Sequence, residues 1–406
     1  MKNKLLAVAV AGALATPGLA LAQSSVTISG IFKVSLDNQR IGNYTRAGRN
    51  SENRIADDSS RVLFNVVEDL GGGLQAIAQL DWRIQFDQGA DNIGGNNHVG
   101  LRSKTLGRIF VGRQDLHYFN RESNLTDLAG SLKADSISLL AYAGGGGQAI
   151  AAATRTPNVI HYTSPNWGGF TVVGAYSTSP NPAGAVAGVG AAGNVTESDI
   201  GSTVRKGNAW NINPNYDGGN WQVGWSHWNQ KNDGGIGAAL ATNAGADQRS
   251  DRLYGSFKMA GFKVGLAWDK SRLKAATAGA GVIGVASAGV AGVAGGAFAS
   301  GTELSNRTAW SIPVSYTMGN NQFHAHYTRA RDDRAIAGDQ GARMLALSYQ
   351  YTMSKRTSVG LTYATIRNNA NANYNFFTNA SLGSASAVAI AGEDPRMLAG
   401  TIRHAF

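Results

Sequence analysis

The sequence predicts an all-β protein, a 16-stranded antiparallel transmembrane β-barrel, and three observations lead to this fold class. Apolar and polar residues alternate along many segments, which is the pattern of a strand with one apolar face. The number of such segments is even, and the connections between them alternate between long loops and tight turns. Strands of about 11 residues with tight turns at one end and long loops at the other are typical of barrels that cross a membrane. Such a barrel has no free edges, so its backbone groups pair within the hydrocarbon layer.

The composition excludes a mainly helical soluble protein and wholesale disorder. The 406 residues include 53 glycines but only 8 prolines, and charged residues make up 15%. This is a poor supply of charge for exposed helix faces, whereas a hydrophobic share of 43% is enough for strands and buried apolar surface. No linker or change of composition divides the chain, which predicts one large domain. Cysteine is absent, so something other than disulfides must hold the fold.

The first residues have the pattern of a secretory signal peptide. Lys2 and Lys4 precede an apolar run that ends at Leu14, and the small-x-small sequence Ala20-Leu21-Ala22 follows. A retained membrane anchor is the alternative, although the apolar run is short for a membrane span. We therefore expect residues 1–22 to be removed and residues 23–406 to form the barrel.

The alternation is regular from the first strand onward. Between residues 26 and 36 the even positions form an apolar set, namely Val26, Ile28, Gly30, Phe32, Val34 and Leu36. The same division predicts sixteen strands, at about 25–36, 60–69, 74–86, 97–104, 107–115, 157–165, 169–178, 207–217, 220–230, 250–260, 261–272, 306–318, 321–332, 342–353, 356–367 and 394–406. Tight turns follow the even-numbered strands, for example Gly71-Gly72-Gly73 and Asp217-Gly218-Gly219. The long connections therefore gather at one end.

A secreted β-sandwich or lectin is the alternative fold, because its strands also alternate. Aromatic residues near the strand ends favour the barrel, since they are in phase with the apolar set, as interfacial girdles require. This set comprises Trp210, Tyr216, Trp221, Trp225, Trp310, Tyr316, Tyr349, Tyr351 and Tyr363.

Several stretches resemble those of one known family. They are the opening 25–30 (SVTISG), residues 68–76 (EDLGGGLQA), residues 107–114 (GRIFVGRQ), the turn 162–166 (YTSPN) and the terminal Phe406. With the signal peptide, they make the chain similar over its whole length to the general porins of Gram-negative β-proteobacteria, which are trimeric outer-membrane diffusion porins.

The resemblance implies a function, partners and a location. The expected location is the bacterial outer membrane, and the expected function is passive diffusion of small hydrophilic solutes and ions through a homotrimer. Phe406 would end the last strand and be read by the assembly machinery, and the third loop would fold inward to narrow the pore. Here that loop is the longest connection, about 116–156. The implied partners are outer-membrane lipid, lipopolysaccharide, small anions and hydrophilic solutes, with no nucleic acid and no cofactor.

Strand phase predicts which charges line the pore. Four basic residues of the first four strands are opposite the lipid-facing set, namely Lys33, Arg61, Arg83 and Arg102. The third loop offers three acids across the lumen, Glu122, Asp127 and Asp135. A basic ladder inside a narrow pore raises the local concentration of anions, which predicts an anion preference. The alternative is that these side chains only solvate a water-filled interior.

Three further basic positions bear on this prediction. Alternation turns Arg113 outward, to a rim or a subunit contact, unless a β-bulge shifts the register. His161 stands where porins of this type often have an arginine, so a cation there would depend on pH. Arg155 could take its place.

The other sequence features carry weaker signals. The Ala/Gly-rich tract in about 274–304 is expected to be an extracellular loop. His324 and His326 have the spacing of two metal ligands, but no third ligand is evident, and ordinary pore lining is favoured. No catalytic residues and no metal site are expected. An outer-membrane barrel that acts as an adhesin, a receptor or an enzyme scaffold is the alternative function.

Overall fold

The computed structural model describes residues 25–87, 89–117, 131–140, 155–180, 207–231, 244–275, 282–283, 299, 301–335, 337–377 and 389–406. The signal peptide predicted at 1–22, most of the Ala/Gly-rich loop, and Glu122 and Asp127 lie outside these residues. Among the described residues, no helix is both long enough and apolar enough to cross a membrane.

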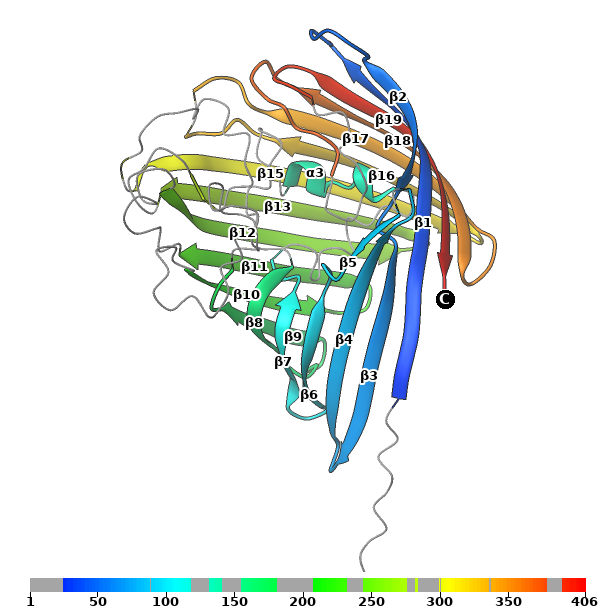
Figure 1. The fold of residues 1–406 in the computed structure, drawn as a ribbon, viewed down its shortest axis with the longest axis vertical. Helices are drawn as coiled ribbons and strands as arrows, with labels where there is room; N and C mark the ends of the chain where they lie inside the picture. Colours follow the sequence, from blue (N-terminus) through cyan, green and yellow to red (C-terminus); the bar gives the residue numbers. More distant parts are fainter. Residues whose placement is uncertain are drawn as a thin grey trace, which may run out of the picture.

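The described strands form one sheet that curves round into a barrel (Figure 1). Its nineteen strands are β1 Ser25–Gly42, β2 Ser51–Asp57, β3 Arg61–Gly71, β4 Leu74–Gln85, β5 Ala90–Asn92, β6 Asn97–Ser103, β7 Gly107–Gln114, β8 Thr156–Thr163, β9 Phe170–Ser177, β10 Asn208–Asp217, β11 Trp221–Lys231, β12 Ala244–Met259, β13 Phe262–Ala275, β14 Val282–Ile283, β15 Glu303–Met318, β16 Asn321–Ala330, β17 Ala342–Thr352, β18 Thr357–Asn368 and β19 Asp394–Ala405.

The nineteen strands correspond to sixteen strands of the barrel wall, because two wall strands are each interrupted and one short strand is not part of the wall. β2 and β3 pair in succession with β1, and β5 and β6 pair in succession with β4, so each pair is one interrupted wall strand. β14 is a two-residue strand parallel to the start of β12. The prediction of a 16-stranded antiparallel barrel is confirmed.

The first interruption explains why the second wall strand is longer than the predicted 60–69. Pairing with β1 extends up to Ser51, but the chain turns sharply between β2 and β3. The Asp57 carboxylate accepts backbone N–H bonds from Ser59 at 2.9 Å and Ser60 at 3.1 Å. A short polar side chain that bonds the backbone two or three residues on is a turn signal in the sequence, and here it makes a break within a strand.

The barrel closes between its first and last strands. β1 runs antiparallel to β19 from the pair Ile31–Ala405 to the pair Gly42–Asp394. Gly30 and Phe406 then exchange two backbone hydrogen bonds of 3.1 Å. A Cβ at Gly30 would lie 2.6 Å from the Phe406 ring, so glycine leaves the space that the terminal ring occupies.

Burial is inverted relative to a soluble protein. On β1, Leu36 is 64% exposed while Ser35 is 1% exposed, and on β17 Leu347 is 48% exposed while Ser348 is 5% exposed. Apolar side chains therefore point away from the barrel and polar ones point into it, which confirms the predicted alternation.

The described part of the third loop, residues 131–140, lies inside the barrel (Figure 1). Its described part holds the 3-10 turn η1 (Leu132–Ala134) and the single-turn helix α3 (Ile137–Leu140). α3 contacts β15, β16 and β17, and η1 contacts β18. Leu139 and Leu140 are fully buried. The expected inward fold of this loop is confirmed.

The barrel wall differs in height around its circumference (Figure 1). β6, β7, β8 and β9 have 7 or 8 residues, whereas β12, β13 and β15 have 14 to 16. We call β6–β9 the short wall and β12–β19 the tall wall; apart from the two-residue β14, the strands of the tall wall have 10 to 16 residues.

Candidate functional site: a charged lumen around the third loop

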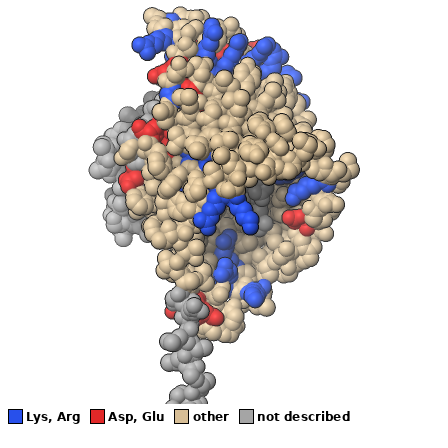
Figure 2. Space-filling view, turned by 90° about the vertical axis from the view of Figure 1, so that its right-hand side faces the viewer, with Lys and Arg blue, Asp and Glu red and all other residues tan. Residues whose placement is uncertain are grey.

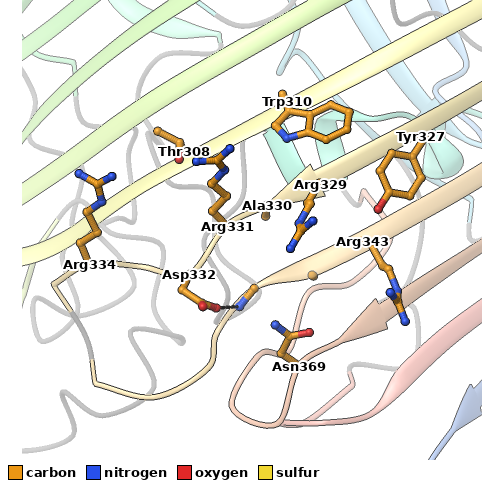
Figure 3. Close-up of a pocket in the computed structure, with 12 residues that line it drawn as sticks. Thr308, Trp310, Tyr327, Arg329, Ala330, Arg331, Asp332, Arg334, Arg343 and Asn369 are labelled. Carbon is orange, nitrogen blue, oxygen red and sulfur yellow. Dashed lines mark hydrogen bonds between the residues drawn. The ribbon is translucent and has the colours of Figure 1, made fainter.

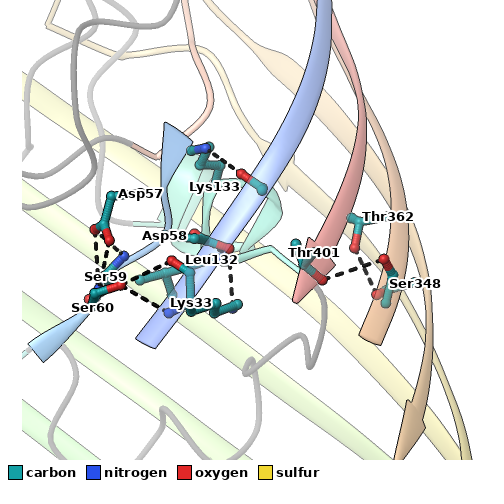
Figure 4. A network of polar contacts seen from close by, with 12 residues as sticks. Lys33, Asp57, Asp58, Ser59, Ser60, Leu132, Lys133, Ser348, Thr362 and Thr401 are labelled. Atoms are coloured by element: carbon teal, nitrogen blue, oxygen red, sulfur yellow. Dashed lines mark hydrogen bonds and ion pairs between the residues drawn. The ribbon is translucent and has the colours of Figure 1, made fainter. Parts of the chain in front are cut away.

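The third loop is tied to β1 and to the end of β2 by charged groups (Figure 4). Lys133 Nζ lies 2.6 Å from Asp37 Oδ2 and donates a bond of 3.0 Å to Ser35 Oγ. The backbone N–H of Leu132 donates to the Asp58 carboxylate at 3.1 Å, and Lys33 Nζ lies 3.2 Å from the same carboxylate. Lys33 thus faces the lumen, but Asp58 compensates its charge.

The opposite side of the loop is tied to the tall wall. His326 Nε2 on β16 donates a hydrogen bond of 2.8 Å to Ala134 O, and Arg307 on β15 donates to Leu139 O. The backbone N–H of Phe377 donates to Lys133 O at 3.1 Å and to Ser138 Oγ at 2.8 Å. The described part of the loop is therefore held by polar contacts on both sides, to β1 and the end of β2 on one side and to the tall wall on the other.

The sequence analysis placed His326 in the pore lining but did not single out Arg307, and it predicted neither residue as an anchor of the loop. Both residues share the inward phase of their strands, which was the available signal. Phase alone could not show that a loop 168 to 192 positions away along the chain would meet them.

Arg61 and Arg83 lie together on the lumen wall. They are register partners on β3 and β4, so their side chains leave the same face of the sheet. Arg83 is 4% exposed; its guanidinium lies 2.7 Å from Asp81 Oδ2 and donates a bond of 3.1 Å to Ser59 Oγ. A buried guanidinium needs such partners because an uncompensated charge there is costly.

A β-bulge changes the direction of Arg113. The register of β7 against β8 shifts between Gly112 and Gln114, and Gly112 has φ of 146°. Arg113 interacts electrostatically with Arg83, Asp115 and Arg155, which places it with the lumen cations. The bulge that the sequence left open as an alternative is therefore present, and the outward direction expected from simple alternation is wrong.

Arg155 and His161 lie at the short wall beside this group. The backbone N–H of Arg155 donates to Asp115 Oδ1 at 2.9 Å. His161 is 2% exposed, and its ring stacks on Phe110 with centroids 4.3 Å apart. Phe110 in turn stacks on His98 at 4.2 Å. The His161 ring is thus packed within a column of aromatic rings on the inner face.

One predicted residue, Arg102, lies apart from the group. Arg102 is exposed next to the tight turn between β6 and β7 and donates bonds of 2.7 and 3.0 Å to Gln75 Oε1. Gln75 is eight positions from Arg83 along β4, about 26 Å at 3.3 Å per residue. The structure therefore does not bring Arg102 into one cluster with Arg61 and Arg83.

Asp135 has a structural environment that the sequence did not indicate. It is 2% exposed, and its carboxylate accepts bonds from Ile137 N at 2.8 Å and Ser136 Oγ at 3.4 Å. The carboxylate thus caps the first turn of α3. The acids found beside the basic residues belong mainly to the barrel wall, and they are Asp37, Asp58 and Asp81.

The charged lumen is visible from the end that carries the tight turns. Figure 2 shows a hollow in this face of the molecule, and Lys and Arg side chains lie around it. A closed barrel with an apolar outer face, a charged interior and a loop anchored across that interior defines a channel-forming protein of the outer membrane.

Comparison with known proteins gives the family. The model of a family described as Gram-negative porin matches residues 7–371, so the chain belongs to that family. An outer membrane porin protein of Bordetella pertussis is 26% identical over 386 residues, which cover 88% of this chain and 92% of the relative. Outer membrane porin protein 32 of Delftia acidovorans is 32% identical over 183 residues, 44% of this chain and 50% of the relative.

Solved structures agree on the fold. An anion-selective porin from Comamonas acidovorans has a TM-score of 0.70 at 21% identity, with 95% of this chain and 100% of that chain covered. OmpF of Salmonella typhi has a TM-score of 0.58 at 12% identity, with 94% and 97% covered. The resemblance seen in the sequence is confirmed, and the chain is a porin of the outer membrane.

Proposed function

We propose that this porin is a passive diffusion channel for small hydrophilic solutes and that it prefers anions. The observation that carries the preference is the grouping of Arg61, Arg83, Arg113 and Arg155 on one side of the lumen. Asp81 and Asp115 compensate part of this charge. In a narrow pore with walls of low dielectric constant, a local excess of cations raises the concentration of anions. The similar barrel from Comamonas is itself described as anion-selective, which supports the proposal.

The same geometry limits the size of that preference. Lys33 is paired with Asp58, and Lys133 is paired with Asp37. Arg102 stands at the tight-turn mouth rather than beside the loop. We therefore propose a moderate anion preference that is set by the arginine group. His161 contributes to it only through its packing on Phe110.

A reversal potential across a potassium chloride gradient tests this proposal. The protein is inserted in a planar bilayer, and the sign of the zero-current potential shows which ion permeates more readily. A sign that corresponds to chloride supports the proposal. A sign that corresponds to potassium overturns the preference while leaving the channel intact.

We further propose that the short wall faces other subunits of a homotrimer. A membrane-spanning strand needs about 9–11 residues. In the short wall, β7, β8 and β9 have 8 residues each, and β6, with 7, continues the wall strand that β5 begins. Their outward residues are nevertheless apolar and exposed, among them Val99, Ile109, Val111 and Ile160. Packing against neighbouring copies would cover an apolar face that is too short to match the bilayer.

The absence of cysteine makes this trimer testable with single-cysteine variants. Val111→Cys lies on the short wall and Leu347→Cys lies on the tall wall, with exposures of 49% and 48% in the single chain. A lipid-soluble maleimide is expected to label Leu347→Cys but not Val111→Cys in the assembled protein. Equal labelling of both would contradict the proposed interface.

We also propose that Phe406 is an assembly signal. It ends the closing strand, its ring lies 4.8 Å from the ring of Phe32, and its backbone pairs with Gly30 at the seam of the barrel. Deletion of Phe406 is expected to reduce the amount of heat-modifiable barrel in the outer membrane, and a normal amount would overturn this role.

A further inference from the structure

The connection between β18 and β19, which we call the last loop, also folds into the barrel. The structure describes its residues 369–377 and 389–393. Connections between strands usually run over the surface of a protein, but here Tyr374 is 1% exposed and Phe377 is 0% exposed. Both rings belong to the same buried cluster as the residues of α3. The last loop therefore packs against the third loop inside the lumen.

Asparagine side chains supply the backbone of the last loop with hydrogen-bond partners. The Asn368 amide nitrogen donates to Tyr374 O at 3.0 Å and to Glu393 O at 2.6 Å, and the Asn368 amide oxygen accepts from Tyr374 N at 2.9 Å. The Asn375 amide oxygen accepts from Ala389 N at 2.8 Å. A buried backbone group without a partner costs free energy, and asparagine readily bonds backbone groups near it. These bonds therefore stabilise the inward conformation of the loop.

The rim end of the last loop is fastened to its neighbours on both sides. Asn369, shown at this rim in Figure 3, donates from its backbone N–H to Gly341 O at 2.9 Å, in the connection between β16 and β17. On the other side, the Glu393 carboxylate accepts from Arg46 Nη2 at 2.8 Å and from Thr45 N at 3.3 Å, in the connection between β1 and β2. The last loop thus enters the lumen from a fixed point on the rim.

The last loop meets the third loop through a hydrogen-bonded contact and a shared arginine. The backbone N–H of Phe377 donates to Lys133 O at 3.1 Å and to Ser138 Oγ at 2.8 Å. The guanidinium carbon of Arg307 lies 5.7 Å from the centre of the Tyr374 ring, and the same guanidinium donates a hydrogen bond to α3. Because the face of an aromatic ring attracts a guanidinium, Arg307 holds both loops at once.

The two loops share one side of the lumen. α3 contacts β15, β16 and β17, η1 contacts β18, and Lys133 bonds to Asp37 of β1. The last loop begins at the end of β18 and ends at the start of β19, on this same side. The lumen arginines lie on the rest of the circumference, on β3, β4 and β7 and directly before β8. The loops and the arginines therefore face each other across the pore.

We propose that the last loop is a second constriction element, in which Tyr374 and Phe377 are positioning residues that fix the third loop and confine solutes to the arginine side of the lumen. Large buried rings with few rotatable bonds keep the third loop from moving back toward the tall wall. The free cross-section of a pore governs which hydrophilic solutes pass it. The proposal rests on the proposed channel function, because it concerns the size limit of the same pore.

Truncation of the two rings tests this role. In Tyr374→Ala with Phe377→Ala, the third loop can move into the space that the rings leave, so single-channel conductance is expected to rise about 1.5-fold. Neutral polymers of graded mass should enter the pore of this variant up to a larger size than in the wild type. The reversal potential should keep its sign, since the arginines are unchanged. Wild-type conductance and a wild-type polymer limit in this variant would overturn the proposal.

Two matched variants separate positioning from general disturbance of the loop. Tyr374→Phe with Phe377→Leu keeps most of the buried volume, so it is expected to restore the conductance and the polymer limit of the wild type. Ile390→Ala shortens a side chain of the same loop that is 41% exposed, and it is also expected to behave like the wild type. An increase in either of these proteins as large as that in the alanine double variant would overturn the positioning role.

A disulfide between the loops tests their contact directly. The chain has no cysteine, and the short distance from Ser138 Oγ to Phe377 N places Ser138→Cys and Phe377→Cys within reach of a disulfide. An oxidant is expected to crosslink this pair in outer-membrane preparations, seen as a changed gel mobility of the heat-denatured chain, and the oxidised channel should conduct like the wild type. Ser138→Cys with Leu347→Cys should not crosslink, because Leu347 is on the lipid-facing side of the wall.

The crosslinking result is decisive in both directions. No crosslink between positions 138 and 377, or an oxidised channel whose conductance differs from that of the wild type, would overturn the proposal. Either result leaves the channel itself intact, whereas a wild-type protein that conducts no current would contradict the proposed function.

Discussion

The lumen and the outer rim of this barrel both display arginines, and the two groups differ in their surroundings. In the lumen, Arg83 is 4% exposed and is held by Asp81 and Ser59. At the outer rim, Arg343 is exposed and has no carboxylate partner among the described residues. A buried charge must be compensated by the protein itself, whereas a charge at the membrane interface can be compensated by water or by lipid. The lumen cations are therefore part of the fold, and the rim cations are available to a ligand.

The two groups lie on different strands. The lumen arginines lie on β3, β4 and β7 and directly before β8, whereas Arg329 and Arg343 lie on β16 and β17 of the tall wall. Strand length does not separate them, because β3 and β4 have 11 and 12 residues and β17 has 11. The face of the strand from which a side chain leaves decides whether it meets the pore or the lipid.

The largest effect is expected from breaking a buried pair in the lumen. Asp37→Ala removes the carboxylate that lies 2.6 Å from Lys133 Nζ and 3.6 Å from Arg54 Nε. Leaving these charges without that partner should cost about 3 kcal/mol. Urea unfolding of the refolded protein measures the loss, and single-channel recordings should show new fluctuations as the loop loses its anchor. An unchanged unfolding midpoint would contradict the assignment of this pair as structural.

A smaller effect is expected when the sign of the lumen charge is changed. Arg61→Glu with Arg83→Glu reverses two adjacent cations, and the ratio of chloride to potassium permeability should fall about fivefold or more. Reversal potentials in a potassium chloride gradient provide the measurement.

The chain offers a control with the same change of four charge units. Arg102→Glu with Lys104→Glu lies at the exposed tight-turn mouth, where water screens the charges. This control should shift the reversal potential less than the Arg61, Arg83 variant does. The reverse order would move the selectivity-determining region to the mouth of the barrel.

A single hydrogen bond to the third loop should contribute less again. His326→Leu removes the donor to Ala134 O, at a cost of about 1 kcal/mol. We expect more frequent partial closures in single-channel records, because the loop is held at one point fewer. His326→Gln retains a side-chain N–H donor and should restore much of the wild-type behaviour. Equal records for the two variants would show that packing at this position, not the hydrogen bond, holds the loop.

The architecture could be predicted from the sequence because alternation is local. Residues such as Leu345 and Leu347 define the outward face of their strand without knowledge of any other strand. The even number of strands, the tight turns and the terminal Phe406 then indicated that the strands close into a barrel and that the long loops gather at one end. The inward direction of the third loop came from the family resemblance, and the structure confirms it.

The arrangement of charges could not be predicted in the same way, because it depends on register and on contacts between distant residues. Alternation placed Arg113 on the wrong face, since one bulge after Gly112 reverses the phase. Alternation also could not show that Arg102 lies far from Arg83 along the barrel axis, because position along this axis depends on how neighbouring strands are staggered. The turn-like sequence at Asp57–Ser60 concealed a strand that continues to Ser51.

The smallest effect is expected from a rim arginine in the absence of lipid. Arg343→Gln removes an exposed guanidinium with no carboxylate partner among the described residues, so the free energy of unfolding of lipid-free protein should change by no more than about 0.5 kcal/mol. Addition of bisphosphorylated lipid A, which stands for the lipopolysaccharide that the family resemblance implies as a partner, should then stabilise the wild type more than the variant, because a ligand that binds only the folded state raises its stability. The comparison between lumen and rim therefore has a direct readout in one assay: Asp37→Ala should lower stability with or without lipid A, and Arg343→Gln should do so only with it. A loss at Arg343 in lipid-free protein as large as that at Asp37 would show that the rim arginine also belongs to the fold.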